Sequence, residues 1–153
     1  KKNKPEYIYI KNKELGTYSD DEKVVKVIAG KFKNAEGPEK NHNVQPIYFH
    51  IVLKSEKEFY CEVPEGHNSF IYLLKGQIKV GEINHEKTND SNLILLKRGK
   101  KLQIKAEKES EFLFIAGKPI GEPIARGGPF VMNTKAEIIE AINDYQNGTF
   151  AKY

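Results

Sequence analysis

The chain has 153 residues, of which 39% are hydrophobic and 30% charged, a composition typical of one globular domain with a highly charged surface. Its net charge of +4 comes from lysines interleaved with acidic residues, and Arg98 and Arg126 are its two arginines. Base reading favours arginine, and phosphate binding favours a clustered basic stripe, so we expect no direct nucleic-acid binding. No apolar run approaches the roughly 20 residues of a bilayer-spanning helix, which excludes a helical membrane protein.

The single cysteine, Cys61, excludes an intrachain disulfide and a cysteine-based zinc site. It alternates with apolar residues in a predicted strand, so we interpret it as a buried side chain that fills space. A single cysteine is typical of a protein in a reducing compartment. We therefore expect a cytoplasmic protein, or a nuclear one if the cell is eukaryotic.

Most of the chain is predicted to be β-strand, because short apolar runs alternate with turn residues. The clearest run has Ile47, Phe49, Ile51 and Leu53 in one phase, the two-residue period of a strand with one buried face. The predicted strands are 24–29, 44–53, 58–63, 69–74, 77–83, 93–96, 101–106 and 111–116. A polar loop is predicted at 84–92. This pattern favours an all-β fold, a jelly-roll β-barrel or sandwich.

One helix is predicted near the end of the chain. Thr134 and Glu137 have the spacing of a capping box, and Gly148 stands where the helix should stop. Between them an apolar face recurs at spacings of three and four residues: Ile138, Ala141, Ile142 and Tyr145. We interpret Gly127-Gly128 as a flexible lead-in to this helix.

Three segments of the sequence resemble the second half of proteins of the pirin family, which are two-barrel cupin proteins. They are Val24 to Gly30, Pro64 to Gly76, and Gly121-Glu-Pro-Ile-Ala-Arg-Gly-Gly-Pro-Phe-Val-Met-Asn-Thr134. The resemblance implies an interdomain linker at residues 1–20, a C-terminal cupin barrel at 21–131, and a C-terminal helix and tail at 132–153. It also implies that the chain is half of a longer protein, whose iron lies in the absent N-terminal cupin.

The cupin metal motifs have lost their ligands in this half. Aligning Tyr72 to Gly76 with the strand that follows the ligands places the motif's histidines on Glu62 and Pro64 and its glutamate on Asn68. In the second motif the ligand position falls on Leu102, or on Ile104 and Ala106. We therefore expect no metal, no cofactor and no catalytic residue in this chain. The histidines are His42, His50, His67 and His85.

Two groups of residues are candidate binding sites. His67, Asn68, Tyr72 and Tyr48 could line a vestigial barrel mouth, although His67 is also readily explained as a histidine hydrogen-bonded to turn backbone. Candidate interdomain contacts are Arg126, Phe130, Ile138, Ile142 and Tyr145, since an arginine beside an aromatic residue and an apolar helix face could hold the two cupin halves together.

The resemblance implies a non-catalytic structural and interaction domain of an iron-binding bicupin, in a family linked to transcription co-regulation. The alternative is part of a quercetin 2,3-dioxygenase-type oxidoreductase whose iron site is in the missing cupin. A third hypothesis is a partner-binding module that acts through the helix and the lysine-rich start. The expected partners are the N-terminal cupin half, a second copy in a homodimer, or another protein. We favour a symmetric dimer over a monomer, because the missing half would leave an apolar patch exposed.

Overall fold

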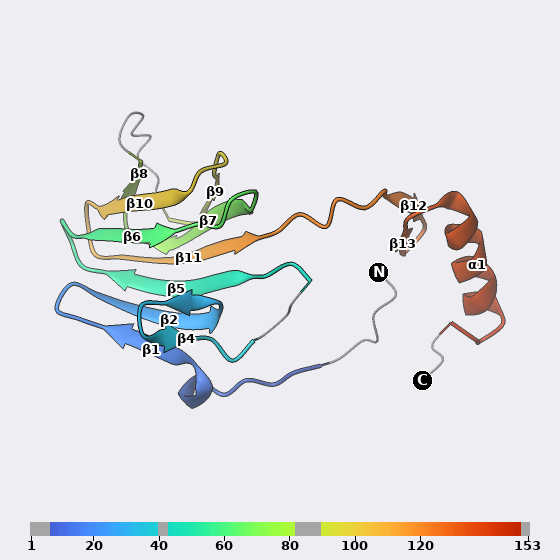
Figure 1. Cartoon of the computed structure of the whole chain (residues 1–153), viewed down its shortest axis with the longest axis horizontal. Helices are drawn as coiled ribbons and strands as arrows, with labels where there is room; N and C mark the ends of the chain where they lie inside the picture. Colours follow the sequence, from blue (N-terminus) through green and yellow to red (C-terminus); the bar gives the residue numbers. More distant parts are fainter. Residues whose placement is uncertain (1–6, 40–42, 82–89, 151–153) are drawn as a thin grey trace. The chain divides into compact units, whose positions relative to one another are not determined.

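The computed structural model describes residues 7–39, 43–81 and 90–150. The chain divides into two compact units: Tyr9–Pro119, and Ile120–Tyr153 with the first residues of the chain. Figure 1 shows the strands of the first unit, and the hairpin and helix that make up the second. In the described part of the chain, no helix is both long enough and apolar enough to cross a bilayer.

The first unit contains a six-stranded antiparallel sheet with the strand order β1-β2-β5-β11-β7-β9. A short 3₁₀ turn, Asn12–Glu14, precedes β1. The strands of the sheet are β1 (Gly16–Ser19), β2 (Lys23–Ala29), β5 (Ile47–Leu53), β11 (Ser110–Gly117), β7 (Asn68–Lys75) and β9 (Asn92–Leu95).

A second, three-stranded sheet of the same unit has the order β6-β10-β8. Its strands are β6 (Glu58–Glu62), β10 (Lys101–Ala106) and β8 (Ile78–Val80), and the small hairpin β3–β4 (Lys31–Phe32 and Ala35–Glu36) follows β2. The inward side chains of both sheets belong to one buried cluster. The predicted all-β sandwich with one C-terminal α-helix is thus confirmed for the described residues.

The core follows from strict alternation along the central strands. In β5 the buried residues are Ile47, Phe49, Ile51 and Leu53, each at most 9% exposed, and the residues between them are only partly buried. Strand β11 repeats the pattern, with Phe112 and Phe114 fully buried. Both strands therefore turn one face to the second sheet and leave the other face accessible.

Phe32, on the β3–β4 hairpin, joins the two sheets through its ring. It stacks on Phe59 of the small sheet, with ring centroids 5.3 Å apart and planes at 19°. Its edge meets Phe49 of the large sheet at 5.7 Å, and Tyr18 packs against it at 5.4 Å. Offset and edge-to-face pairs of this kind add to the free energy of burial. The interior of the sandwich is consequently closed by aromatic side chains.

The second unit consists of the hairpin β12–β13 (Ala125–Gly127 and Phe130–Met132) and helix α1 (Lys135–Gln146). The predicted capping box is present: the Thr134 hydroxyl accepts from the Glu137 N–H at 3.2 Å, and the Glu137 carboxylate accepts from the Thr134 N–H at 3.0 Å. Gly148 follows the helix with φ +69°, a conformation that favours glycine.

The interpretation of Gly127-Gly128 as a flexible lead-in to the helix was wrong, because these residues belong to a hairpin packed under α1. A Cβ atom on Gly127 would come within 2.4 Å of Ile138 Cγ2. Gly128 lies in the tight turn with φ +55°. Strands of three residues, such as β12 and β13, are too short to show a period in the sequence, which is why the hairpin was not predicted.

Replacing Phe32 with Ala should destabilise the first unit by about 3–5 kcal/mol, because the substitution empties the space between the two sheets. Phe32→Leu, which fills most of that space, should cost less. Urea denaturation followed by circular dichroism measures both values. A midpoint for Phe32→Ala equal to that of the wild type would contradict the assigned role of this ring.

Candidate functional site

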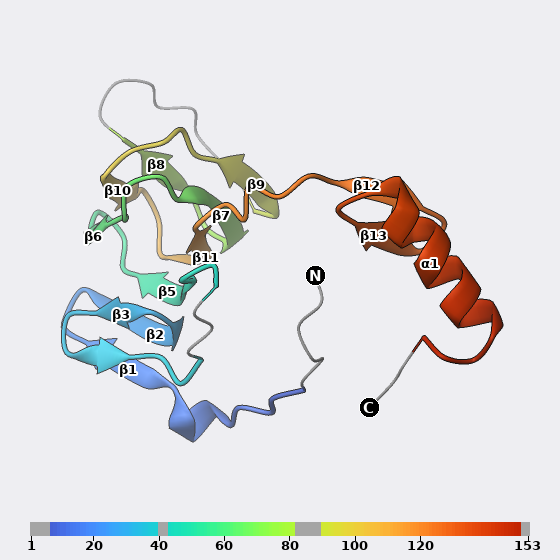
Figure 2. The ribbon, with the colours of Figure 1, turned by 45° about the vertical axis from the view of Figure 1, so that its right-hand side comes forward.

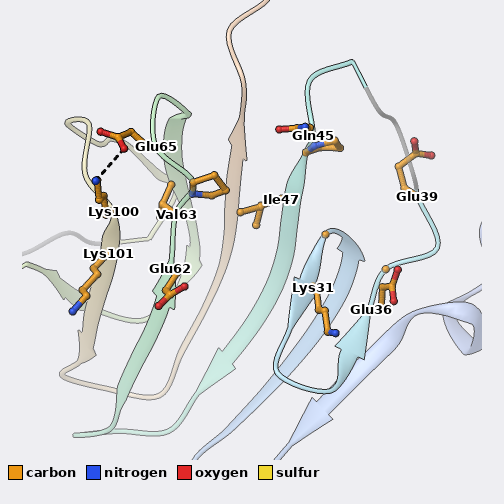
Figure 3. Close-up of a pocket in the computed structure, with 14 residues that line it drawn as sticks. Lys31, Glu36, Glu39, Gln45, Ile47, Glu62, Val63, Glu65, Lys100 and Lys101 are labelled. Atoms are coloured by element: carbon orange, nitrogen blue, oxygen red, sulfur yellow. Dashed lines mark ion pairs between the residues drawn. The ribbon is translucent and has the colours of Figure 1, made fainter.

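An open cavity of about 1060 Å³ lies at one end of the sandwich, where β6 ends and β10 begins. Figure 3 shows its two walls, one formed by the β3–β4 hairpin and the other by β6 and β10. The lining residues are Gly30, Lys31, Glu36, Gly37, Glu39, Gln45, Pro46, Ile47, Glu62, Val63, Pro64, Glu65, Lys100 and Lys101.

The rim of this cavity carries charges of both signs. Lys31 stands opposite Glu36 across the hairpin, and Glu62 stands opposite Lys101 across the sheet. Lys100 Nζ lies 3.0 Å from a Glu65 carboxylate oxygen, the ion pair marked in Figure 3. Both side chains of this pair are more than 70% exposed, so it contributes little to stability. The rim can therefore offer donors and acceptors to a polar ligand without a strong charge of either sign.

The bottom of the cavity is apolar. Ile47 and Val63 line it and are both members of the buried core cluster, which also contains Phe32 and Phe59. A ligand at the rim would consequently rest on packed hydrocarbon, since the interior of the sandwich is occupied by side chains.

His67 lies beside the cavity and is 4% exposed. Its Nε2 is 3.1 Å from the carbonyl oxygen of Gln45, and its backbone N–H donates to the Pro64 carbonyl. Nδ1 has no hydrogen-bond partner among the described residues. Gln45 and Pro64 both line the cavity, so His67 ties two loops of the rim together from behind. This contact corresponds to the interpretation of His67 as a histidine bound to backbone.

The other three residues of the predicted barrel mouth lie elsewhere. Asn68 is exposed at the start of β7. Tyr48 and Tyr72 alternate with the buried residues of β5 and β7, so they lie on the face of the large sheet that points away from the core. None of the four, His67 included, lines the cavity. Strand phase separates Tyr48 and Tyr72 from the cavity, because its lining comes mainly from strand ends, loops and the hairpin.

Sequence reasoning missed the hairpin wall of the cavity. The turn around Asn34 to Pro38 is visible in the sequence as a cluster of turn residues, but the two-residue strands on either side of it are not. Lys100 precedes the predicted strand 101–106 and Lys101 begins it, so their place at its start could have been read from the sequence.

The positions of the cupin metal motifs do not fit an iron ion. Glu62 and Asn68 are exposed, and Pro64 has no side-chain donor. Leu102 is 5% exposed and packs in the core, as do Ile104 and Ala106. Among the residues that the structure describes, no three His, Cys, Asp or Glu side chains form a group able to hold a metal.

The remaining histidines lie apart from these positions. His50 is on the outer face of the large sheet, where its Nε2 lies 2.6 Å from a Glu111 carboxylate oxygen. His42 and His85 fall outside the described residues.

The candidate interdomain residues lie on the hairpin and helix of the second unit. Ile138 is 7% exposed and packs under Gly127, while Ile142 is partly buried. Phe130 contacts Tyr145 and Phe150, with ring centroids 5.9 and 5.0 Å apart. Arg126 stands opposite Val131 across the hairpin and is exposed. Ile138 thus serves the unit's own small core, whereas Tyr145 and Arg126 remain accessible.

Cys61 lines a second cavity of about 480 Å³, which shares Lys31, Glu62 and Lys101 with the first. Its side chain packs against the core from β6, opposite Leu102. Burial raises the pKa of the Cys61 thiol to about 12. A thiol with that pKa is a poor nucleophile at neutral pH, which agrees with its interpretation as a space-filling side chain.

Comparison with known proteins gives a consistent result. The family model of the Pirin C-terminal cupin domain matches residues 48–151. A protein of Thermoplasma acidophilum is 34% identical over 158 residues, covering 97% of this chain and 59% of that protein. Human pirin is 33% identical over 147 residues, covering 94% of this chain and 50% of pirin.

A solved structure agrees with these sequence matches. The crystal structure of quercetin 2,3-dioxygenase from Acinetobacter baumannii superposes with a TM-score of 0.79 at 33% identity, covering 94% of this chain and 50% of that one. The chain therefore spans between 50% and 59% of the length of these proteins.

The raised pKa of Cys61 predicts slow reaction with a thiol reagent. At pH 8 only about one thiol in ten thousand would be ionised if its pKa is about 12, whereas roughly a quarter would be in unfolded chain with the ordinary pKa near 8.5. Native protein should thus react on the order of a thousandfold more slowly than protein in guanidinium, and faster as the pH rises. Equal rates with Ellman's reagent in the two states would contradict the burial.

Proposed function

We propose that this chain, which belongs to the pirin family as its C-terminal cupin domain, is a non-catalytic domain. In this proposal it binds the iron-bearing first cupin of the family. The absent half and its iron are what the family resemblance implies. In this role the sandwich is a rigid support, and the hairpin and helix of the second unit provide the contact with the partner domain.

The observation that carries this proposal is the exposed apolar surface of the second unit. Within it Ile138 and Ala141 of the helix are buried. Large apolar side chains remain accessible around them: Ile120 65%, Ile124 68%, Val131 45%, Ile139 60%, Tyr145 68% and Phe150 47% exposed. A unit of this size buries too little surface to be stable alone, so this apolar surface calls for a partner.

The length of the relatives supports the choice of partner. The chain matches about half of human pirin and about half of the Acinetobacter dioxygenase. A bicupin has another barrel available in the same molecule, and the exposed side chains of Ile139 and Tyr145 would pack on it. Arg126, exposed on the hairpin, would add a planar fork of donors for a carboxylate or carbonyl of that barrel.

The alternative is that the chain is half of a quercetin 2,3-dioxygenase-type oxidoreductase, which its similarity to the Acinetobacter enzyme favours. The chemistry would then belong to iron in the first cupin, and this half would stabilise and enclose that site. The transcription co-regulation linked to the family would likewise belong to the whole protein. A fluorescence titration of quercetin with this chain alone tests one version of this alternative, in which the charged cavity is part of the pocket. Saturable binding would support that version, and no binding up to high micromolar quercetin would exclude it.

Binding of the first cupin can be tested with the separately expressed N-terminal half of the Thermoplasma relative. Isothermal titration calorimetry should detect a one-to-one complex with this chain. Ile139→Asp should weaken it at least about tenfold, because the carboxylate would be buried against apolar surface. Glu140→Lys, at the next exposed position of the same helix, is the matched control and should bind normally. Equal affinity of Ile139→Asp and the wild type would contradict the proposed contact surface.

A further inference from the structure

The second unit is held together by a very small core. Two of its described apolar side chains are buried, Ile138 and Ala141, at 7% and 3% exposed. Ile138 packs under Gly127 of the hairpin, and Figure 2 shows the hairpin β12–β13 alongside α1. The large buried cluster of the sandwich belongs entirely to the first unit. Because hydrophobic burial is the main gain that offsets the conformational entropy lost on folding, the second unit has little to offset that loss.

Helix α1 is also weak by itself. It has 12 residues, and isolated helices shorter than about 12–15 residues are marginal in water. Its sequence contains three β-branched isoleucines together with Asn143 and Asp144, all of lower helix propensity than alanine. The last turn holds Asp144 and no basic residue, so the charge there opposes the helix dipole. The helix therefore depends on tertiary contacts for its stability.

Local interactions nevertheless bias this segment toward one conformation. The capping box of Thr134 and Glu137 fixes the start of α1. At the other end the Thr149 N–H donates to the Asp144 carbonyl at 2.8 Å, and the Thr149 hydroxyl lies 3.0 Å from the Asp144 carboxylate. These bonds join residues three and five positions apart. They specify which structure forms, but they do not bury the apolar surface that would stabilise it.

We propose that the hairpin and helix of the second unit exchange between an open and an ordered form in the free chain, with the open form favoured, and become fully ordered when a partner buries their exposed apolar side chains. This inference rests on the proposed function for its partner, the first cupin. Folding of the unit and binding are then coupled, so part of the interaction free energy is used to order the segment. The observed affinity is reduced in proportion to the fraction of free chains that are already ordered. The segment thus makes complex formation sensitive to the stability of one helix.

Hydrogen exchange of the whole chain without a partner tests the open form directly. The backbone amides of α1 should be protected less than about tenfold, because the open form is favoured. The amides of β5 and β11 in the same molecules are the internal control, and they should be protected at least about a thousandfold. Protection in α1 equal to that in β5 would overturn the proposal.

Two variants of Glu140 test the coupling between folding and binding. Glu140 is exposed on α1, and replacing it with alanine or with glycine removes the same carboxylate. The two variants differ in helix propensity, so in the calorimetric titration with the first cupin Glu140→Gly should bind about four- to fivefold more weakly than Glu140→Ala. Equal affinities would overturn the coupling. Failure of the proposed function has a different signature: no variant forms a complex, while α1 of the free chain still exchanges rapidly.

Discussion

The packing of Phe32 between Phe59 and Phe49 is the contact on which the rest of the first unit depends. The short β3–β4 hairpin supplies this ring, which bridges both sheets. The hairpin is thereby fixed in place, and it becomes one wall of the charged cavity. The same aromatic packing fills the interior, so the functional surfaces of this domain lie on its outside.

That arrangement separates stability from binding in this domain. The buried faces of β5, β7 and β11 are hydrocarbon apart from Ser110 at the start of β11, while the outer faces of β5 and β7 carry Tyr48, His50 and Tyr72. The positions that the family resemblance aligns with cupin metal ligands are core residues, such as Leu102, or exposed residues, such as Glu62. Among the described residues, the surfaces available for interaction include the charged cavity rim, the edge strand β9, and the apolar surface of the hairpin and helix.

Much of the fold could be predicted because the strands obey a simple period. Alternation placed β5 and its buried face correctly, and the Thr134–Glu137 pair identified the helix start. The hairpins β3–β4 and β12–β13 could not be found this way, since two or three residues do not define a period. The cavity was missed for the same reason, because Lys31 and Glu36 line it as residues of the β3–β4 hairpin. For His67 the sequence left two interpretations, a residue of a barrel mouth and a histidine bound to turn backbone, and its contact with Gln45 depends on a loop that sequence alone cannot position.

The iron content of the chain alone, after anaerobic reconstitution with Fe(II) and desalting, tests most directly whether this cupin has lost its metal site. We expect almost no iron, because the motif positions offer Pro64, Leu102 and exposed Glu62 and Asn68 in place of a ligand set. Iron close to one atom per chain would contradict the loss of the site. That result would require a site built from histidines that the cupin motifs do not contain, and it would transfer the chemistry to this half of the protein.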